Sequence, residues 1–148
     1  MSRPGTIVTD MTLDHELPMS SHLTVSERAL ARSEPRLRIV QGDVYARLSH
    51  PPERTYDVVL IDLDHSPDEH LGGANASFYT EAGLSRARRH LSEGGILGVW
   101  SYAEHSPVAT ALREVFAEVQ VEPVTVVNDL VGEEQTDWLF FARDPSQT

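Results

Sequence analysis

The hydrophobic pattern of the chain centres on residues 56–67, where the apolar run 58–61 is followed by acids, a histidine and a Ser-Pro break. A short apolar run between turn signals predicts a strand buried on both faces, as in a parallel sheet. In open α/β sheets, ligands bind outside the carboxyl ends of such strands. Asp62, Asp64 and His65 are therefore the first candidates for chemistry.

Strands and helices alternate along most of the chain, because short apolar runs predict strands and apolar positions three and four apart predict helices. The elements expected are a helix at 24–32, a strand at 37–41, a short helix at 44–48, the strand at 56–62, a helix capped by Thr80, a strand at 96–100, a helix capped by Ser106, and strands at 121–127 and 136–142. Such alternation predicts an α/β fold, a parallel sheet with helices on both faces. The last two strands are expected to form an antiparallel hairpin.

The connecting segments give further expectations. Residues 6–19 alternate loosely, which predicts a small hairpin, so we expect an N-terminal extension at 1–23 and an α/β domain at 24–148. Residues 65–77 contain a Gly-Gly pair and predict a loop over the end of the central strand, either a lid or an ordinary connection. The helix after Thr80 is expected to place Leu84, Ala87 and Leu91 on one face.

A cluster of basic residues lies towards the end of that helix, and we interpret it first as a solvated face and second as a ligand contact. Its members are Arg86, Arg88, Arg89 and His90.

The composition excludes or disfavours several classes of function. The chain has 148 residues and no cysteine, which excludes disulfides and thiolate chemistry and fits a reducing cytoplasm. No apolar run reaches the length of about 18 residues that a membrane span needs, and no signal core is present. The net charge of −11 disfavours nucleic acid and is compatible with a cationic substrate such as a polyamine, although many globular domains are simply acidic.

Several short motifs carry a resemblance to a known family. They are Met19-Ser20-Ser21 before a helix, Gly42-Asp43 after a strand, the strand end Asp62-Leu63-Asp64-His65-Ser66-Pro67, Phe78-Tyr79-Thr80, and Gly94-Gly95 before a strand. Over residues 12–143 the chain resembles the class I S-adenosylmethionine-dependent transferase fold, and within it spermidine synthase-like proteins, the polyamine aminopropyltransferases. The resemblance implies a Rossmann-like class I methyltransferase fold with a truncated, mostly parallel sheet.

The resemblance also implies a site. Gly42, Asp43, Val44 and Asp62 match positions that hold S-adenosylmethionine or decarboxylated S-adenosylmethionine, and Asp43 matches the acid that accepts a hydrogen bond from the adenine amino group. Asp62 matches the acid that helps to deprotonate the attacking amine, with Asp64 and His65 beside it. A carboxylate suits this step because a protonated amine is no nucleophile.

The site departs from the family at two positions. His65 stands where a second acid binds the diamine, and Trp100 stands where the next strand ends in glutamine. A structural interpretation stays open as well, since strand-end acids often cap the following loop, and His65 suits a loop hydrogen bond.

One part of the family pattern is missing. Two strands are expected between Leu30 and Leu37, the first ending in a glycine-rich loop and the second in an acid that holds the ribose hydroxyls, but only six residues lie there. No G-x-G-x-x-G sequence occurs in the chain. The strand at 56–62 would then have an unpaired edge, which we expect either the strand at 37–41 or a second copy of the chain to cover.

Three functions remain open. The first is an aminopropyl- or methyltransferase that acts on a small-molecule amine, and the second is a non-catalytic remnant that binds a partner or itself. The third is a metal site formed by Asp62, Asp64, His65 and His70, although the five-residue spacing of the histidines does not match a helical zinc motif.

Overall fold

The computed structural model describes residues 6–10, 38–42, 44–61, 73–128 and 132–145. The chain divides into two compact units, residues 1–47 and 48–148. The helix expected at 24–32 and the domain boundary expected at residue 23 lie outside the described residues.

The first unit contains two parallel strands, β1 (Thr6–Asp10) and β2 (Arg38–Gly42), in a register that runs from Thr6 opposite Arg38 to Asp10 opposite Gly42. Parallel strands require a long crossover connection, and residues 11–37 are long enough to form one. The strand expected at 37–41 is thus confirmed. The first part of the hairpin expected over 6–19 is a strand, β1, which pairs with β2; residues 11–19 lie outside the described residues, so the hairpin itself stays a prediction.

The second unit is built on a four-stranded mixed sheet with the order β3-β4-β6-β5. Its strands are β3 (Tyr56–Ile61), β4 (Leu91–Ser101), β5 (Glu118–Asn128) and β6 (Glu133–Arg143). β3 and β4 are parallel, whereas β6 is antiparallel to both β4 and β5. The expected α/β fold with a C-terminal antiparallel hairpin is confirmed.

Short helices connect these strands, and their starts follow from capping residues. Helix α4 (Glu81–Arg88) begins after Thr80, whose Oγ1 accepts a hydrogen bond from the Gly83 amide at 3.2 Å. Helix α5 (Pro107–Val115) begins after Ser106, whose Oγ accepts one from the Ala109 amide at 3.2 Å. Both side chains satisfy amide groups that a helix start leaves without a partner.

Two boundaries differ from the expectation. Leu91 is the first residue of β4, opposite Tyr56, because α4 already ends at Arg88. Residues 73–78 form helix α3 (Gly73–Phe78), so the second half of the loop expected at 65–77 is helical. Residues 65–72 lie outside the described residues. The short helix expected at 44–48 is confirmed as α2 (Val44–Ser49), and the division between the two units falls inside it.

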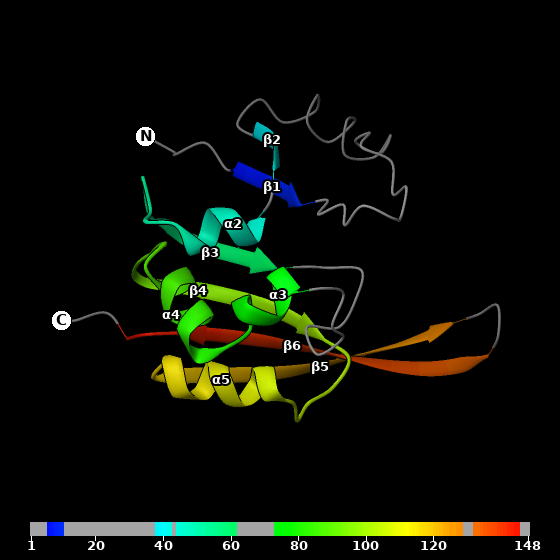
Figure 1. Ribbon diagram of the computed structural model, residues 1–148. Coiled ribbons are helices and arrows are strands. Elements are labelled where there is room, and N and C mark those ends of the chain that lie inside the picture. Colours follow the sequence, from blue (N-terminus) through cyan, green and yellow to red (C-terminus); the bar gives the residue numbers. More distant parts are fainter. Residues whose placement is uncertain (1–5, 11–37, 43, 62–72, 129–131, 146–148) are drawn as a thin grey trace. The chain divides into compact units, whose positions relative to one another are not determined.

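The hydrophobic core lies on one face of the four-stranded sheet, where α4 and α5 pack (Figure 1). Leu97 and Val99 of β4 and Phe140 and Ala142 of β6 alternate with outward residues and are at most 2% exposed. Leu84, Ala87, Val108, Ala109, Ala111 and Leu112 cover them from the two helices and are also buried. Val108, Ala111 and Leu112 recur three and four positions apart, so they form one buried face of α5.

The strand β3 is less buried than its apolar run predicts. Val58 is 53% and Leu60 is 69% exposed, whereas Ile61 is buried. Ile61 lies on the same face as the buried Val99, with which it pairs, whereas Val58 and Leu60 lie on the opposite face, away from the core under α4 and α5. The side chain of Leu60 lies over Gly98 of β4, where a β-carbon would come within 2.6 Å of it.

The strand pairing bears on one further expectation. β2 pairs with β1 within the first unit, and the expectation that the strand at 37–41 or a second copy covers β3 stays a prediction. β5 and β6 are longer than expected and extend together beyond the end of β4 (Figure 1). No described helix is long and apolar enough to cross a membrane.

Replacing Phe140 with alanine tests the assignment of the core. Phe140 is fully buried, and we expect Phe140→Ala to lower the free energy of unfolding by about 3–5 kcal/mol, the usual cost of such a cavity. Val126→Ala, at a position 50% exposed, is the control and should change it by less than about 0.5 kcal/mol. Urea denaturation followed by circular dichroism gives both values, and equal losses would contradict this core.

Candidate functional site

The first part of the predicted site is the carboxyl edge of the β1–β2 pair. Gly42 is the last residue of β2, and Val44 is the first residue of α2, so a strand ends and a helix begins within three positions. This strand-to-helix junction is where α/β folds bind nucleotides. Asp43 lies between them in the sequence but outside the described residues.

A second acid ends the neighbouring strand β1, and the sequence analysis did not identify it. Asp10 is the last residue of β1 and pairs with Gly42, so the carboxyl ends of both strands coincide. An acid at the end of a neighbouring strand is the group that holds ribose hydroxyls in dinucleotide-binding α/β folds. The signal was the apolar stretch Thr6-Ile7-Val8-Thr9 ending in Asp10, which was interpreted as half of a local hairpin.

The second part of the predicted site follows the carboxyl end of β3. Ile61, the last residue of this strand, is buried and pairs with Val99 of β4. Asp62, Asp64, His65 and His70 come after it in the sequence and lie outside the described residues, so their roles stay predictions. Among the residues that the structure does describe, no group of three metal-binding side chains occurs.

The neighbouring carboxyl end, that of β4, carries an aromatic pair. The rings of Trp100 and Tyr102 meet edge to face with their centroids 4.1 Å apart, and Tyr102 is 44% exposed. Between them Ser101 is fully buried, and its Oγ accepts a hydrogen bond from the Ala103 amide at 3.2 Å. This bond turns the chain out of the sheet just after the strand.

The basic cluster at the end of α4 is largely structural. His90 is 4% exposed, and its Nε2 donates a hydrogen bond to the His50 carbonyl oxygen at 2.9 Å, so this residue is not part of a solvated face as expected. Arg88 is half exposed, yet its Nε lies 2.5 Å from Asp144 Oδ2, and it donates a hydrogen bond to the Val115 carbonyl oxygen at 3.1 Å.

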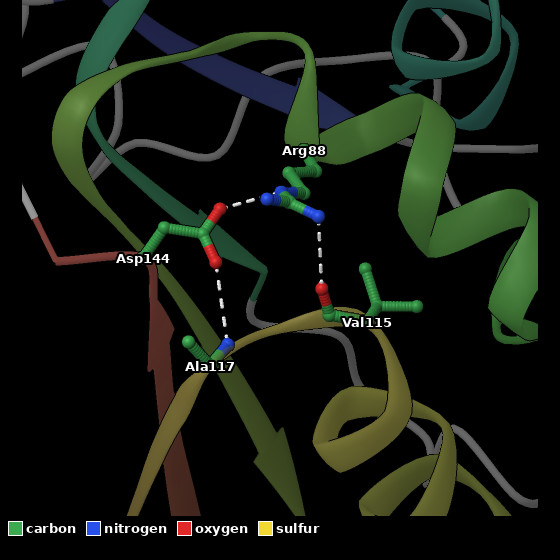
Figure 2. A network of polar contacts seen from close by, with 4 residues as sticks. All are labelled: Arg88, Val115, Ala117 and Asp144. Carbon is green, nitrogen blue, oxygen red and sulfur yellow. Dashed lines mark hydrogen bonds and ion pairs between the residues drawn. The ribbon is translucent and has the colours of Figure 1, made fainter.

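Figure 2 shows that these contacts form one network. Asp144 also accepts a hydrogen bond from the Ala117 amide at 3.2 Å, so its carboxylate joins the end of β6 to the segment between α5 and β5. Arg88 in turn joins the last turn of α4 to the free carbonyl at the end of α5. The two side chains therefore join α4, α5, the segment before β5 and the end of β6.

An open surface hollow of about 620 Å³ lies next to this network. Its lining residues are Ser85, Arg88, Arg89, Leu91, Ser92, Glu93, Gly94, Gly95, Asp144 and Pro145. They come from the last turns of α4, the amino end of β4 and the two residues after β6, and this is the opposite end of β4 from the predicted chemistry. Its two arginines face two acids, so the hollow favours neither sign of charge, and we do not place the site there.

Comparison with known proteins was made by sequence and by structure. No protein-family model and no curated protein sequence matches the chain. Solved structures do match: spermidine synthase from Thermotoga maritima superposes with a TM-score of 0.57 at 15% identity, over 80% of this chain and 38% of that protein. A probable spermidine synthase from Corynebacterium glutamicum gives 0.54 at 19% identity, over 83% and 46%.

A methyltransferase gives a similar result. Human methyltransferase-like protein 13 in complex with SAH superposes with a TM-score of 0.55 at 17% identity, over 80% of this chain and 57% of that protein. At these identities the likeness is one of fold, and it confirms the expected spermidine synthase-like, class I methyltransferase fold. The chain spans less than half of the length of each of the two synthases.

Substitutions in the Arg88–Asp144 network should reveal its structural role. We expect Arg88→Met, which keeps the aliphatic stem, to lower the free energy of unfolding by about 1–2 kcal/mol, because an ion pair and a charged hydrogen bond are lost together. In a double-mutant cycle with Asp144→Asn, the two losses should be clearly less than additive.

The matched control is the pair Arg143–Glu118, which is 2.6 Å long and similarly exposed but joins only two neighbouring strands. Arg143→Met should cost less than about 1 kcal/mol. Equal losses in urea denaturation for the two arginine variants would contradict a special role for Arg88.

Proposed function

We propose that the chain binds the adenosyl group of S-adenosylmethionine or of a related sulfur compound, and that it transfers an aminopropyl or methyl group to a small-molecule amine. The observation that carries this proposal is the parallel pairing of β1 and β2, which brings Asp10 and Gly42 to one edge of a sheet in a class I methyltransferase fold. Spermidine synthases and an SAH-bound methyltransferase share the fold.

The hydrogen-bond acceptors proposed for this edge suit a nucleoside. A carboxylate accepts two hydrogen bonds, so Asp10 can hold the two ribose hydroxyls, and Asp43, which follows Gly42 in the sequence, can accept one from the adenine amino group. Gly42 lets the ligand approach the backbone closely because it has no side chain. When bound, such a compound supplies a carbon attached to a positively charged sulfur.

The amine is proposed to meet the chain after β3 and β4. Asp62 is the proposed base that takes the amine proton, with Asp64 and His65 nearby in the sequence. The exposed ring of Tyr102, supported by Trp100, offers an aromatic face to an alkylammonium ion. The net charge of −11 would attract a cationic substrate of this kind.

The competing proposal is a non-catalytic protein of the same fold. The sequence has no glycine-rich loop, whose backbone amides would otherwise hold the middle of the cofactor. A protein without it can still fold and associate through its exposed strand. Cofactor binding separates the two proposals.

Calorimetric titration with 5′-methylthioadenosine, S-adenosylmethionine and its decarboxylated form tests the nucleoside site. We expect binding by the full chain and an affinity loss of about 10- to 100-fold in Asp43→Ala, because a hydrogen bond to a charged acceptor is removed. No heat from a folded sample with any of the three compounds would favour the non-catalytic proposal.

The role of Asp10 has its own test. The wild-type chain should bind 2′-deoxy-5′-methylthioadenosine about 10-fold or more weakly than 5′-methylthioadenosine, whereas Asp10→Ala should bind both equally weakly. Asp137→Ala, which removes an acid from the outer part of the β5–β6 hairpin, is the control and should behave like the wild type. If Asp10→Ala still bound 5′-methylthioadenosine more tightly than the 2′-deoxy compound, by the same factor as the wild type, Asp10 would not be the residue that holds the ribose.

The amine side is tested by transfer assays with diamines. We expect Asp62→Asn to lower the transfer rate by about 10²- to 10⁴-fold, the usual contribution of a general base. Tyr102→Leu should raise KM for the amine by about 2- to 30-fold, and Tyr102→Phe should keep the wild-type value, because only the ring matters. A normal rate in Asp62→Asn would exclude it as the base.

A further inference from the structure

The surface hollow of about 620 Å³ is formed by a bulge in β4, and all of its lining residues belong to the second unit. Between the pairs Tyr56–Leu91 and Val58–Ile96, β4 has four residues, 92–95, where β3 has one. Ser92 fixes this bulge to β3, because its Oγ donates a hydrogen bond to the Tyr56 carbonyl oxygen at 3.2 Å. The bulge, the last turns of α4 and the two residues after β6 together line the hollow.

Four charged side chains line the hollow, and two of them compensate each other. The Arg88 guanidinium is held by Asp144 and by the Val115 carbonyl oxygen, as Figure 2 shows. Arg89 and Glu93 are both exposed, and within the described part of the chain neither side chain makes a hydrogen bond or an ion pair. Although they line the same hollow, they are too far apart to pair with each other. The hollow therefore offers one cation and one anion to a ligand.

A ligand with a charge of one sign suits this hollow poorly. An anion would meet Glu93, Asp144 and the negative end of α4, whose last turn is part of the lining. A cation would meet Arg88 and Arg89. A molecule that carries both charges finds a compensating partner for each of them, so a zwitterion is the best match.

We propose that the hollow binds a free α-amino acid with an apolar side chain. The carboxylate pairs with Arg89, and the Ser85 hydroxyl, four residues earlier on the same face of α4, donates a further hydrogen bond to it. The ammonium group pairs with Glu93. The side chain of the amino acid lies against Leu91 and Pro145, the two lining residues with hydrocarbon side chains. The volume of the hollow is in the range of small-molecule sites.

Two glycines of the bulge complete the lining. Gly94 has a φ of 70°, a left-handed conformation that favours glycine. A β-carbon at Gly95 would come within 2.9 Å of the Ser92 carbonyl oxygen and 3.0 Å of the Tyr56 carbonyl oxygen, so this position packs closely against the backbone of both strands. The amide groups of the two glycines therefore report directly on a ligand in the hollow.

NMR titration of the ¹⁵N-labelled full chain with l-leucine tests the site. The amide signals of Gly94 and Gly95 should shift in a saturable way, with a dissociation constant of about 0.1–5 mM, as expected for two solvent-exposed charge pairs. N-acetyl-l-leucine lacks the ammonium group and l-leucinamide lacks the carboxylate. Each should bind about fivefold or more weakly than l-leucine.

Two substitutions that remove a charge identify the partners. Arg89→Gln should weaken the binding of l-leucine about fivefold but leave that of l-leucinamide unchanged, and Glu93→Gln should weaken l-leucine but leave N-acetyl-l-leucine unchanged. Arg113→Gln and Glu114→Gln, at exposed residues of α5 outside the hollow, are the matched controls and should bind l-leucine like the wild type.

The absence of a saturable shift up to about 20 mM l-leucine would overturn the proposal, and so would equal binding of the three compounds. Tighter binding of N-acetyl-l-leucine than of l-leucine would make the hollow a plain anion site and would overturn it as well. An equal loss for all three compounds in both variants would overturn the assignment of Arg89 and Glu93 to opposite ends of the ligand. Circular dichroism confirms that each variant is folded.

Discussion

Strand β4 is the element on which the second unit depends. It is paired along both edges, in parallel with β3 and antiparallel with β6, so it carries the change of strand direction within the sheet. Its buried residues Leu97 and Val99 lie under α4 and α5, and its own Gly98 leaves room for the side chain of Leu60. The parallel β3–β4 pair is therefore joined to the antiparallel β6–β5 pair through β4 alone.

Local signals predicted much of this architecture. The cap residues Thr80 and Ser106 marked helix starts correctly, because capping depends on residues only three positions apart. The helix after Thr80 was expected to include Leu91, because Leu91 follows Ala87 at helical spacing. The helix ends at Arg88, and Leu91 is the first residue of β4. Features that depend on a few neighbouring residues, such as helix caps, were thus predicted more reliably than the residue at which a helix ends.

Long-range pairing was the harder part. The burial of Val58 and Leu60 depends on which strands flank β3, and an apolar run does not contain that information. The pairing of Asp10 with Gly42 joins segments that are far apart in the sequence, so the sequence analysis identified only one acid at that edge, Asp43. The ends expected for the strands at 37–41 and 56–62 lie within one residue of the observed ends, Gly42 and Ile61, while the roles of Asp62, Asp64 and His65 remain predictions.

The β5–β6 hairpin has a consequence for the way in which the chain folds. Its eleven residue pairs run from Glu118 opposite Arg143 to Asn128 opposite Glu133. Because only four residues separate Asn128 from Glu133, the pairs next to this connection form at little cost in chain entropy. The β3–β4 pairing joins residues 56 and 91 and must close a much longer loop. Since local contacts form fastest, the hairpin should act as an early template onto which β4 and then β3 are added. β3, the first of these four strands in the sequence, is then the last to be ordered.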